Sequence, residues 1–364
     1  MQIDMHYYGT YAMARAAGMK RDSARVVATA AQFVDDNAHK ESIEIRDGAR
    51  IDSQATAHHS YNIKNVDLED QRRVWVPFHF LPGNEGESYT ERLVCQMDSP
   101  IAREMIANNI SIAIDADFGL ELLGVTAHVY ADTFSHYGFS GISSRKNRVI
   151  NDSIQLDENL SAEIRTYIES KAKAFFEREG PQGGLLQNVK RWFISSMAEN
   201  LSGGLGHGAV ATYPDRPYLR WRFIYESPKH SSEPRHNDET FLEGCRQLHA
   251  MFRSFLERTD HADYDGVEFG SIEDRVMTIL QTQANKEGRI QAWQKAAKAG
   301  ELFGGRGEPI PVYKDWHSDW EKLTWLKDSR KALDSSLYRY FQAASTHRNY
   351  VLRHLLPAHG IVVQ

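Results

Sequence analysis

Three residues with metal-binding side chains, His128, Asp132 and His136, recur at four-residue spacing in the segment AHVYADTFSHYGFSG. On a helix this spacing places all three side chains on one face. At about 1.5 Å of rise per residue, His128 and His136 are about 12 Å apart along the axis, too far to bind one ion. The spacing therefore predicts that the Asp132 carboxylate bridges two metal ions, with one histidine beside each. Imidazole nitrogen and carboxylate oxygen suit zinc, and also manganese or iron.

A multinuclear centre needs more ligands than one helix offers, and four other places in the chain carry histidines or acids. An acid and a histidine lie near the N-terminus, an acid pair ends an apolar helical pattern, one histidine lies in an apolar run, and a histidine and an acid lie in a loop rich in Gly and Pro. Taken singly, each has an ordinary structural explanation, such as a solvated helix end or a core histidine with its hydrogen bonds satisfied. These candidate ligands are Asp4, His6, Asp35, Asp36, His79, His207 and Asp215.

The order of these residues along the chain resembles that of a known superfamily, the zinc-dependent phospholipases C and the related single-strand nucleases. Those proteins are mainly helical, hold three zinc ions in a cleft, and take their ligands from residues in this order. The resemblance covers residues 1–215, and its tight motif is the His-x-x-x-Asp formed by His128 and Asp132. The matching positions are His6, Asp35 or Asp36, His79, His128, Asp132, His136, His207 and Asp215.

The N-terminus departs from the superfamily's pattern. Its secreted members use the free amine of a processed first residue as a zinc ligand, whereas this sequence starts at Met1. We therefore expect Asp4 to substitute for that amine, or the third metal position to stay empty. The chain is also similar to a family of uncharacterised bacterial proteins that share the runs MQIDMHYYGTYA, AHVYADTFSHYGFSG and GHGAVATYPDRPYL. This second resemblance implies no function.

The function implied by the superfamily is hydrolysis of a phosphoester, most naturally a phosphodiester, by a metal-activated hydroxide. Asp132 would bridge two of two or three zinc ions about 3.5–4 Å apart, and one carboxylate of the pair Asp35 and Asp36 would orient the attacking water. The substrate would be a phosphate-containing small molecule, a lipid head group or a single-stranded nucleic acid. The candidates for binding its phosphate or walling its cleft are Arg216, Arg220 and Tyr137.

Two alternatives stay open for the same residues. A metal-dependent amidase or phosphomonoesterase could use the same ligands, and a non-catalytic protein could use metal only to hold its helices together. Several other enzyme classes are disfavoured because their motifs are missing. The sequence contains no His-Asp dipeptide, no His-Glu-x-x-His, no Gly-Lys-Ser/Thr loop and no Gly-x-Ser-x-Gly elbow.

Hydrophobic periodicity predicts a mainly helical chain, and the superfamily implies a multi-helix bundle like that of the phospholipases C and nucleases. Helical patterns cover residues 8–17, 22–34, 90–109, 114–137, 160–178, 185–200, 239–257, 272–298 and 316–356. A small β insertion is expected near residues 42–80, where Asp47-Gly48 is a hairpin signal and Val74–Phe80 is typical of a short edge strand. We expect a helical metal-site domain over residues 1–300 and a helical C-terminal extension over residues 301–364, packed on it.

Composition and charge exclude some classes of function. The chain carries 43 Lys and Arg against 49 Asp and Glu, a formal net charge of −6, which disfavours binding to duplex DNA. Two distant cysteines, Cys95 and Cys245, indicate neither a disulfide framework nor a CxxC metal motif. No apolar run approaches the ~20 residues of a membrane span, and the N-terminal segment lacks the features of a signal peptide. We therefore expect a cytoplasmic protein, with signal-independent export as an alternative.

Overall fold

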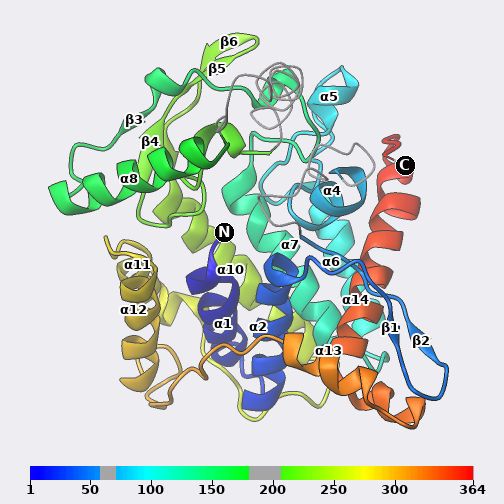
Figure 1. Ribbon diagram of the computed structural model, residues 1–364. Helices are drawn as coiled ribbons and strands as arrows, with labels where there is room; N and C mark the ends of the chain where they lie inside the picture. Colours follow the sequence, from blue (N-terminus) through cyan, green and yellow to red (C-terminus); the bar gives the residue numbers. More distant parts are fainter. Residues whose placement is uncertain (58–70, 180–205, 364) are drawn as a thin grey trace.

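The computed structural model describes residues 1–57, 71–179 and 206–363, and over these ranges the chain is mainly helical, as predicted (Figure 1). The longer helices pack together in a bundle, and short strands lie at its periphery. The helices of the bundle are α1 (Thr10–Ala16), α2 (Arg21–Asp36), α6 (Pro100–Ala113), α7 (Gly119–His136), α10 (Asn237–Leu256), α11 (Glu273–Leu280), α12 (Lys286–Lys298) and α14 (Ser336–Tyr350). Shorter or more peripheral helices are α4 (Val76–Phe78), α5 (Tyr89–Arg92), α8 (Ala162–Glu179), α13 (His317–Thr324) and α15 (Leu356–Ala358).

The central element is α7, which carries the His128–Asp132–His136 series. Nearly every residue of this helix is buried, because α2, α6, α10 and α14 pack around it. A helix that is apolar on all sides is expected at the centre of a bundle rather than on its surface. The polar residues of α7 are therefore buried too, so their hydrogen-bonding and charge must be satisfied within the protein.

Helix α7 packs closely against α2. Gly124 of α7 lies directly against α2, where a Cβ atom would collide with the Val27 carbonyl oxygen and the Ala30 side chain. This contact requires a residue without a side chain on α7 and small residues on α2. It brings the α2 carbonyl of Ala31 within 2.7 Å of His128 Nδ1. The glycine and the alanines therefore help to set the position of a candidate ligand.

The predicted β insertion is partly confirmed. Strands β1 (Ile43–Glu44) and β2 (Arg50–Ile51) pair antiparallel around the Asp47-Gly48 turn, where Gly48 has a φ of 92°. Residues 58–70 lie outside the described residues. The prediction of a strand at Val74–Phe80 is wrong, because this run forms a π-helical turn, Gln71–Trp75, followed by α4. Short apolar runs fit a buried helix as well as a strand, and Pro77 stands in the first turn of α4, where its fixed φ favours a helix.

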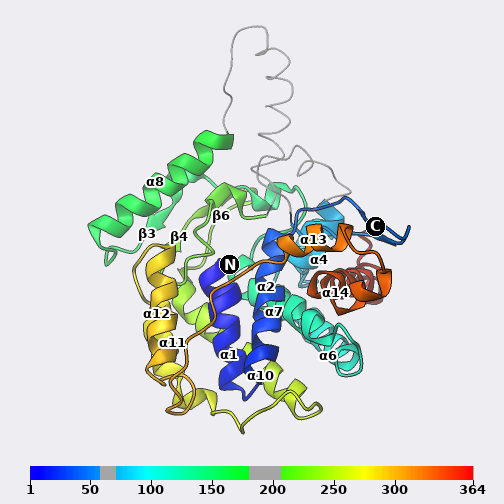
Figure 2. The ribbon, with the colours of Figure 1, turned by 60° about the horizontal axis from the view of Figure 1, so that its bottom comes forward.

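Further short strands lie beside α8, outside the predicted insertion (Figures 1 and 2). β3 (Gln155–Leu156), β4 (Arg220–Arg222) and β7 (Arg235–His236) form a three-stranded antiparallel sheet, and β5 (Ile224–Glu226) pairs with β6 (Lys229–Ser231). A small apolar cluster, which includes Ile168, Trp221 and Phe223, packs between α8 and this sheet. This unit carries the Gly/Pro-rich loop with His207 and Asp215 toward the end of α7.

Other predicted helices differ in their extent. The pattern over residues 90–109 is divided into α5 and α6, since Ser99 caps a new helix that starts at Pro100. The pattern over 272–298 is divided into α11 and α12, where Asn285 caps the second helix. The pattern over 185–200 lies outside the described residues. No helix among the residues described is long and apolar enough to cross a membrane.

Residues after 300 contribute to the same large apolar core as the N-terminal helices. The α14 side chain of Tyr340 hydrogen bonds Thr56, and buried His347 contacts Asn109 of α6 and the Pro77 carbonyl. The segment 301–311 is an irregular connection, as its glycines and prolines predict. The C-terminal helices therefore support the segments of the chain that lead into the candidate site.

Candidate metal centre

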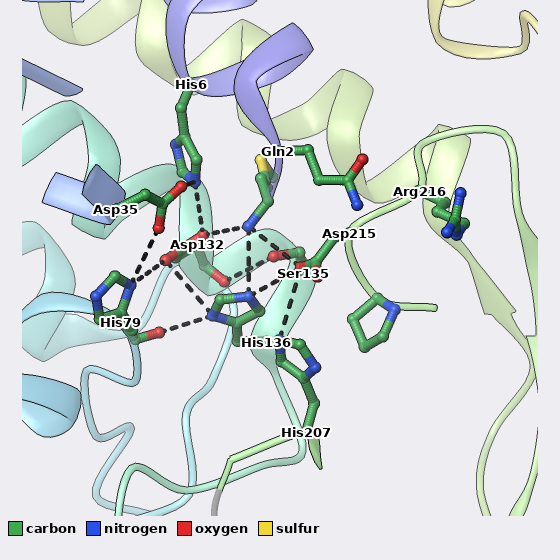
Figure 3. Close-up of polar contacts among 12 residues, drawn as sticks. Gln2, His6, Asp35, His79, Asp132, Ser135, His136, His207, Asp215 and Arg216 are labelled. Carbon is green, nitrogen blue, oxygen red and sulfur yellow. Dashed lines mark hydrogen bonds and ion pairs between the residues drawn. The ribbon is translucent and has the colours of Figure 1, made fainter. Parts of the chain in front are cut away.

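Four side chains from three separate segments meet around the middle of α7, and Figure 3 shows three of them, Asp35, His79 and Asp132. His128 and Asp132 come from α7, Asp35 from the last turn of α2, and His79 from the residue that ends α4. The Asp132 Oδ2 atom lies 3.1 Å from His128 Nε2 and 3.3 Å from His79 Nδ1, and these two nitrogens are 3.2 Å apart. Asp35 Oδ1 lies 3.8 Å from His79 Nδ1 and 3.9 Å from His128 Nε2. We call these four atoms the first donor group.

The spacing of the first donor group fits one tetrahedral zinc ion. Ligand atoms about 2.0–2.1 Å from a tetrahedral zinc ion are about 3.3 Å from one another. The five distances given above, which do not include the pair Asp35–Asp132, range from 3.1 to 3.9 Å. Two imidazole nitrogens and two carboxylate oxygens also form a chemically appropriate ligand set for zinc.

The tautomers of four histidines favour metal binding. In each ring one nitrogen lies 2.7–2.8 Å from a backbone carbonyl oxygen, which can only accept a hydrogen bond, so that nitrogen must carry the proton. The other nitrogen then presents a lone pair to the cluster. Backbone or carboxylate partners of this kind orient the histidine ligands in metal sites. The pairs are His128 Nδ1 with Ala31, His79 Nε2 with Thr56, His136 Nδ1 with His79, and His207 Nδ1 with Ala211.

His6 lies on the other side of Asp132 and belongs to a second donor group. Its Nε2 atom is 3.1 Å from Asp132 Oδ1 and 3.9 Å from Asp35 Oδ2, and its ring stacks on His128 with centroids 3.8 Å apart. The ring is fully buried, and neither nitrogen has a hydrogen-bond partner among the residues that the structure describes. Leaving a buried polar group unpaired costs about 1–3 kcal/mol, and a metal ion at Nε2 would satisfy one of these two atoms.

The third donor group lies at the C-terminal end of α7. His136 Nε2 is 3.2 Å from Asp215 Oδ1, and His207 Nε2 is 3.7 Å from the same oxygen. All three ligand atoms lie within 4.8 Å of one another. The sequence placed His136 beside one of two ions bridged by Asp132. Instead, Asp132 joins the first and second groups, and His136 turns toward the loop that carries His207 and Asp215.

The nitrogen of Met1 lies between the second and third donor groups. It is 2.7 Å from Asp132 Oδ1, 3.3 Å from Asp215 Oδ1 and 3.4 Å from His136 Nε2. Burial lowers the pKa of this amine, but the carboxylates of Asp132, Asp215 and Asp35 outweigh burial and raise the pKa to about 11. An ammonium group and a metal ion would therefore compete for the same carboxylates.

The expectation that Asp4 supplies a ligand is wrong. Its carboxylate forms a buried salt bridge with Arg289 of α12, at 2.7 Å from Nε and 3.0 Å from Nη2, and Arg289 also donates to Gln2. Asp4 and His6 are two residues apart on a helical turn, and side chains at that spacing do not face each other. Asp4 thus anchors the N-terminal segment, while the position expected for it is taken by the Met1 nitrogen.

The alternative Asp36 is also outside the cluster. Its carboxylate accepts hydrogen bonds from the Tyr313 hydroxyl, at 2.5 Å, and from Gln32, at 3.3 Å. Asp35 is the acid of the pair that faces the ligands. Its side chain is 31% exposed, and that of His207 is 18% exposed, whereas those of His6, His79, His128 and Asp132 are 0–4% exposed. Solvent therefore reaches the cluster beside Asp35 and His207.

The charge states of His6, His136 and Asp132 suit metal binding at neutral pH. Burial lowers the pKa of His6 well below its usual value and that of His136 to about 4, so both rings are neutral ligands. Burial would raise the pKa of Asp132, but nearby His136, the Met1 ammonium and His128 hold it well below its usual value. Burial raises the pKa of Asp35. Three carboxylates packed this closely supply the negative charge that a cation would neutralise.

Arg235, which the sequence analysis did not identify, fixes the end of α7. It donates to the carbonyl oxygens of Ser135 and Tyr137, at 2.7 and 2.8 Å, and its guanidinium lies 3.6 Å above the Tyr137 ring. A cation at a helix C-terminus satisfies the last carbonyl groups and complements the helix dipole. Gly138, with a φ of 84°, then turns the chain away from the helix. Arg235 therefore fixes the backbone on both sides of His136.

The predicted substrate-binding residues have different surroundings. Arg220 is paired with Asp238, at 2.7 and 3.1 Å, and with Glu239, so its prediction as a phosphate ligand is corrected to a structural salt bridge. The face of the Tyr137 ring is covered by the guanidinium of Arg235. Arg216 follows Asp215 and lies beyond it from the donor groups (Figure 3). Arg216 alone of the three has unpartnered donor atoms.

The fold and site define a mainly helical protein with three adjacent groups of metal-ligand atoms along one central helix. The chain belongs to a family of unknown function, DUF6765, whose model matches residues 1–355. Comparison with curated proteins found no match. Comparison with solved structures likewise found none.

Proposed function

We propose that the chain is a zinc-dependent hydrolase of phosphodiesters, and that its helical bundle is related to those of the zinc-dependent phospholipases C and single-strand nucleases. The observation that carries the proposal is the Asp132 carboxylate, whose two oxygens face different sets of histidines. Oδ2 is 3.1 Å from His128 Nε2, and Oδ1 is 3.1 Å from His6 Nε2. A carboxylate shared in this way is the arrangement expected when two metal ions lie side by side.

Each donor group would hold one ion. Asp35, His79, His128 and Asp132 supply four ligand atoms to the first, and His6 with the remaining oxygens of Asp132 and Asp35 supplies the second. His136, His207 and Asp215 supply the third. When bound, such ions supply Lewis acidity, which makes water easier to deprotonate and offsets negative charge on a phosphoryl group.

The chain's own residues favour catalysis over a purely structural role for the metal. A structural zinc site is typically closed by four protein ligands and sealed from solvent. Here the second and third groups offer fewer side-chain ligands, and the Asp35 carboxylate is partly exposed. Asp35 is the most exposed side chain of the first and second donor groups, so it lies where water from solvent would reach the ions. Buried Asp132 holds its position through contacts with His79, His128 and His6.

A substrate panel with a matched pair of variants tests this function. The zinc-loaded protein is expected to hydrolyse bis(p-nitrophenyl) phosphate faster than p-nitrophenyl phosphate, and not to hydrolyse p-nitroacetanilide. Asp35→Asn is expected to lower kcat/KM for the diester by about 10²-fold or more, because it removes the exposed carboxylate. Asp36→Asn is the control and should stay within about threefold, because Asp36 contacts Tyr313 rather than the cluster.

Preferred cleavage of the amide would instead identify an amidase, and preferred cleavage of the monoester a phosphomonoesterase. The proposal is wrong if the zinc-loaded protein cleaves none of the three substrates. It is also wrong if Asp35→Asn and Asp36→Asn lower the kcat/KM for the diester equally.

A further inference from the structure

A buried arginine beside the metal centre has hydrogen-bond donors with no partner. Arg216 is 2% exposed, and its Nε and Nη1 atoms contact no acceptor among the residues that the structure describes. Its Nη2 atom donates to Thr212 Oγ1 at 3.0 Å, and its guanidinium lies 5.2 Å from the centre of the Tyr167 ring of α8. No carboxylate in the described part of the chain forms an ion pair with it. Taking a guanidinium out of water without a counter-ion is unfavourable, so this arrangement calls for an explanation.

The other deeply buried arginines among the described residues have acid or carbonyl partners. Arg15 is paired with Glu308 and Asp263, and Arg289 with Asp4. Arg235 donates from Nη1 and Nη2 to two carbonyl oxygens that end α7, and its Nε atom alone lacks a partner in the described part of the chain. Arg216 differs from all three, because its one side-chain hydrogen bond within the described residues is to a neutral hydroxyl.

A second unpartnered donor lies in the same loop. The hydroxyl of Tyr218 is buried and has no hydrogen-bond partner among the described residues. The Tyr218 ring lies 5.8 Å from the guanidinium of Arg289 and belongs to the small apolar cluster against which Tyr167 packs. Because Tyr167 also contacts Arg216, the two unpartnered side chains share one neighbourhood beside α8. The exposed Lys171, with Nζ 5.7 Å from the same Tyr167 ring, adds a further positive charge.

The loop that carries these donors is held firmly in place. Asn237 at the start of α10 donates from its side chain to the carbonyl oxygens of Tyr213 and Arg216, both at 2.8 Å, and Asn237 is itself 1% exposed. Donors fixed in position before a ligand arrives lose little entropy on binding. The unpaired atoms of Arg216 and Tyr218 are therefore a feature of a preorganised loop.

We propose that Arg216 and Tyr218 form a phosphate subsite next to the metal centre. A phosphate group offers several anionic oxygens, which can accept from the Arg216 nitrogens and the Tyr218 hydroxyl and also neutralise the buried charge. Arg216 directly follows Asp215 of the third donor group along the chain and lies beyond Asp215 from the donor groups (Figure 3), so the subsite lies on the Asp215 side of the reaction centre. Its occupant is a second phosphate of the substrate, adjacent to the phosphodiester that is cleaved. This assignment to the substrate rests on the proposed hydrolytic function, whereas phosphate binding itself does not.

Thermal unfolding with inorganic phosphate tests the subsite without any measurement of activity. Phosphate at about 100 times its Kd is expected to raise the Tm of the wild-type protein by about 3 °C. Arg216→Met should weaken phosphate binding by roughly 10- to 100-fold and reduce that shift by about half or more, without lowering the Tm in the absence of phosphate. Arg222→Met is the matched control, since Arg222 is an exposed arginine of the adjoining strand β4, and it should retain the full shift.

Two conservative variants keep the test decisive if Arg216→Met does not fold. Tyr218→Phe removes only the hydroxyl and should reduce phosphate affinity by about three- to tenfold, and Arg216→Lys should retain part of it. The subsite is disproved if phosphate stabilises Arg216→Met and Arg216→Lys as much as the wild type, which would place the ion at the metal centre alone. It is also disproved if phosphate does not stabilise the wild type.

Dinucleotide substrates test whether the occupant is part of the substrate. The wild type should cleave pdTpdT with a kcat/KM at least about tenfold above that for dTpdT, and Arg216→Met should lose this preference while still cleaving dTpdT. An equal preference in both proteins would contradict the assignment. If the wild type cleaves neither compound while phosphate binding still depends on Arg216, the hydrolytic function fails and the phosphate site stands.

Discussion

Replacement of Asp132 by asparagine is expected to remove at least one zinc ion per chain and to lower the kcat/KM for a phosphodiester by roughly 10³-fold. The two side chains have nearly the same shape, but asparagine is neutral and offers one oxygen instead of two. Asp132 Oδ1 faces His6, and Oδ2 faces His79 and His128, so the substitution disrupts two donor groups at once. Elemental analysis of the purified variant, together with initial rates on bis(p-nitrophenyl) phosphate, measures both effects.

Asp117→Asn is the control for this substitution. Asp117 is exposed and lies just before α7, the same helix that carries Asp132. Metal content and rate should both be unchanged in this control. An Asp132→Asn variant with the wild-type metal content and activity would mean that Asp132 does not bridge the donor groups.

Removal of metal with a chelator is expected to destabilise the fold strongly. The loss of one ion held at about 1,000 times its Kd would cost about 4 kcal/mol, which corresponds to about 5 °C in Tm for a chain of this length, and each further ion would add to this. The physical reason is that Asp35, Asp132 and Asp215 would be left close together, with the Met1 ammonium in place of the metal charge. These ligands also join α2, α4 and α7, so their repulsion acts on the centre of the bundle.

Differential scanning calorimetry before and after chelation measures this loss. Added zinc should restore the Tm, whereas calcium should not, because calcium requires six to eight oxygen ligands rather than imidazole nitrogens. An unchanged Tm after metal removal has been verified by elemental analysis would contradict a role for metal in holding the helices together.

The sequence predicted the helical character of the chain and the central position of His128 and Asp132. Both predictions rest on periodicity: apolar residues that recur every three to four positions mark helices, and a spacing of four places side chains on one face. The convergence of Asp35, His79 and His128 could not be derived in this way, because it depends on how α2 and α4 pack against α7. Only the order of these residues along the chain indicated it.

Two of the site errors could have been avoided by local geometry. Ala31 and Asp35 are four residues apart, so the α2 face that contacts His128 also carries Asp35 and not Asp36. By the same rule, Asp4 and His6 cannot both face one site from a helical turn. The roles of Arg235 and Arg289 were beyond the sequence, since their partners lie at separations of 98 and 285 residues.

The strand wrongly predicted over Val74–Phe80 reflects a different limit. An apolar run of seven residues with no alternation is compatible with a buried strand or a buried helix, and tertiary packing decides between them. The small strands near residues 220–236 were not assigned because each is only two or three residues long. Arg220 was therefore placed in a phosphate site, although it lies on β4, where it is paired with Asp238.

The most direct test of the metal centre is the zinc content of the protein purified from a host grown with zinc. Inductively coupled plasma mass spectrometry, calibrated against the protein concentration, is expected to find two to three zinc ions per chain, one for each donor group that is filled. Less than one transition-metal ion per chain, with no recovery after zinc is added and unbound metal is removed, would contradict the account.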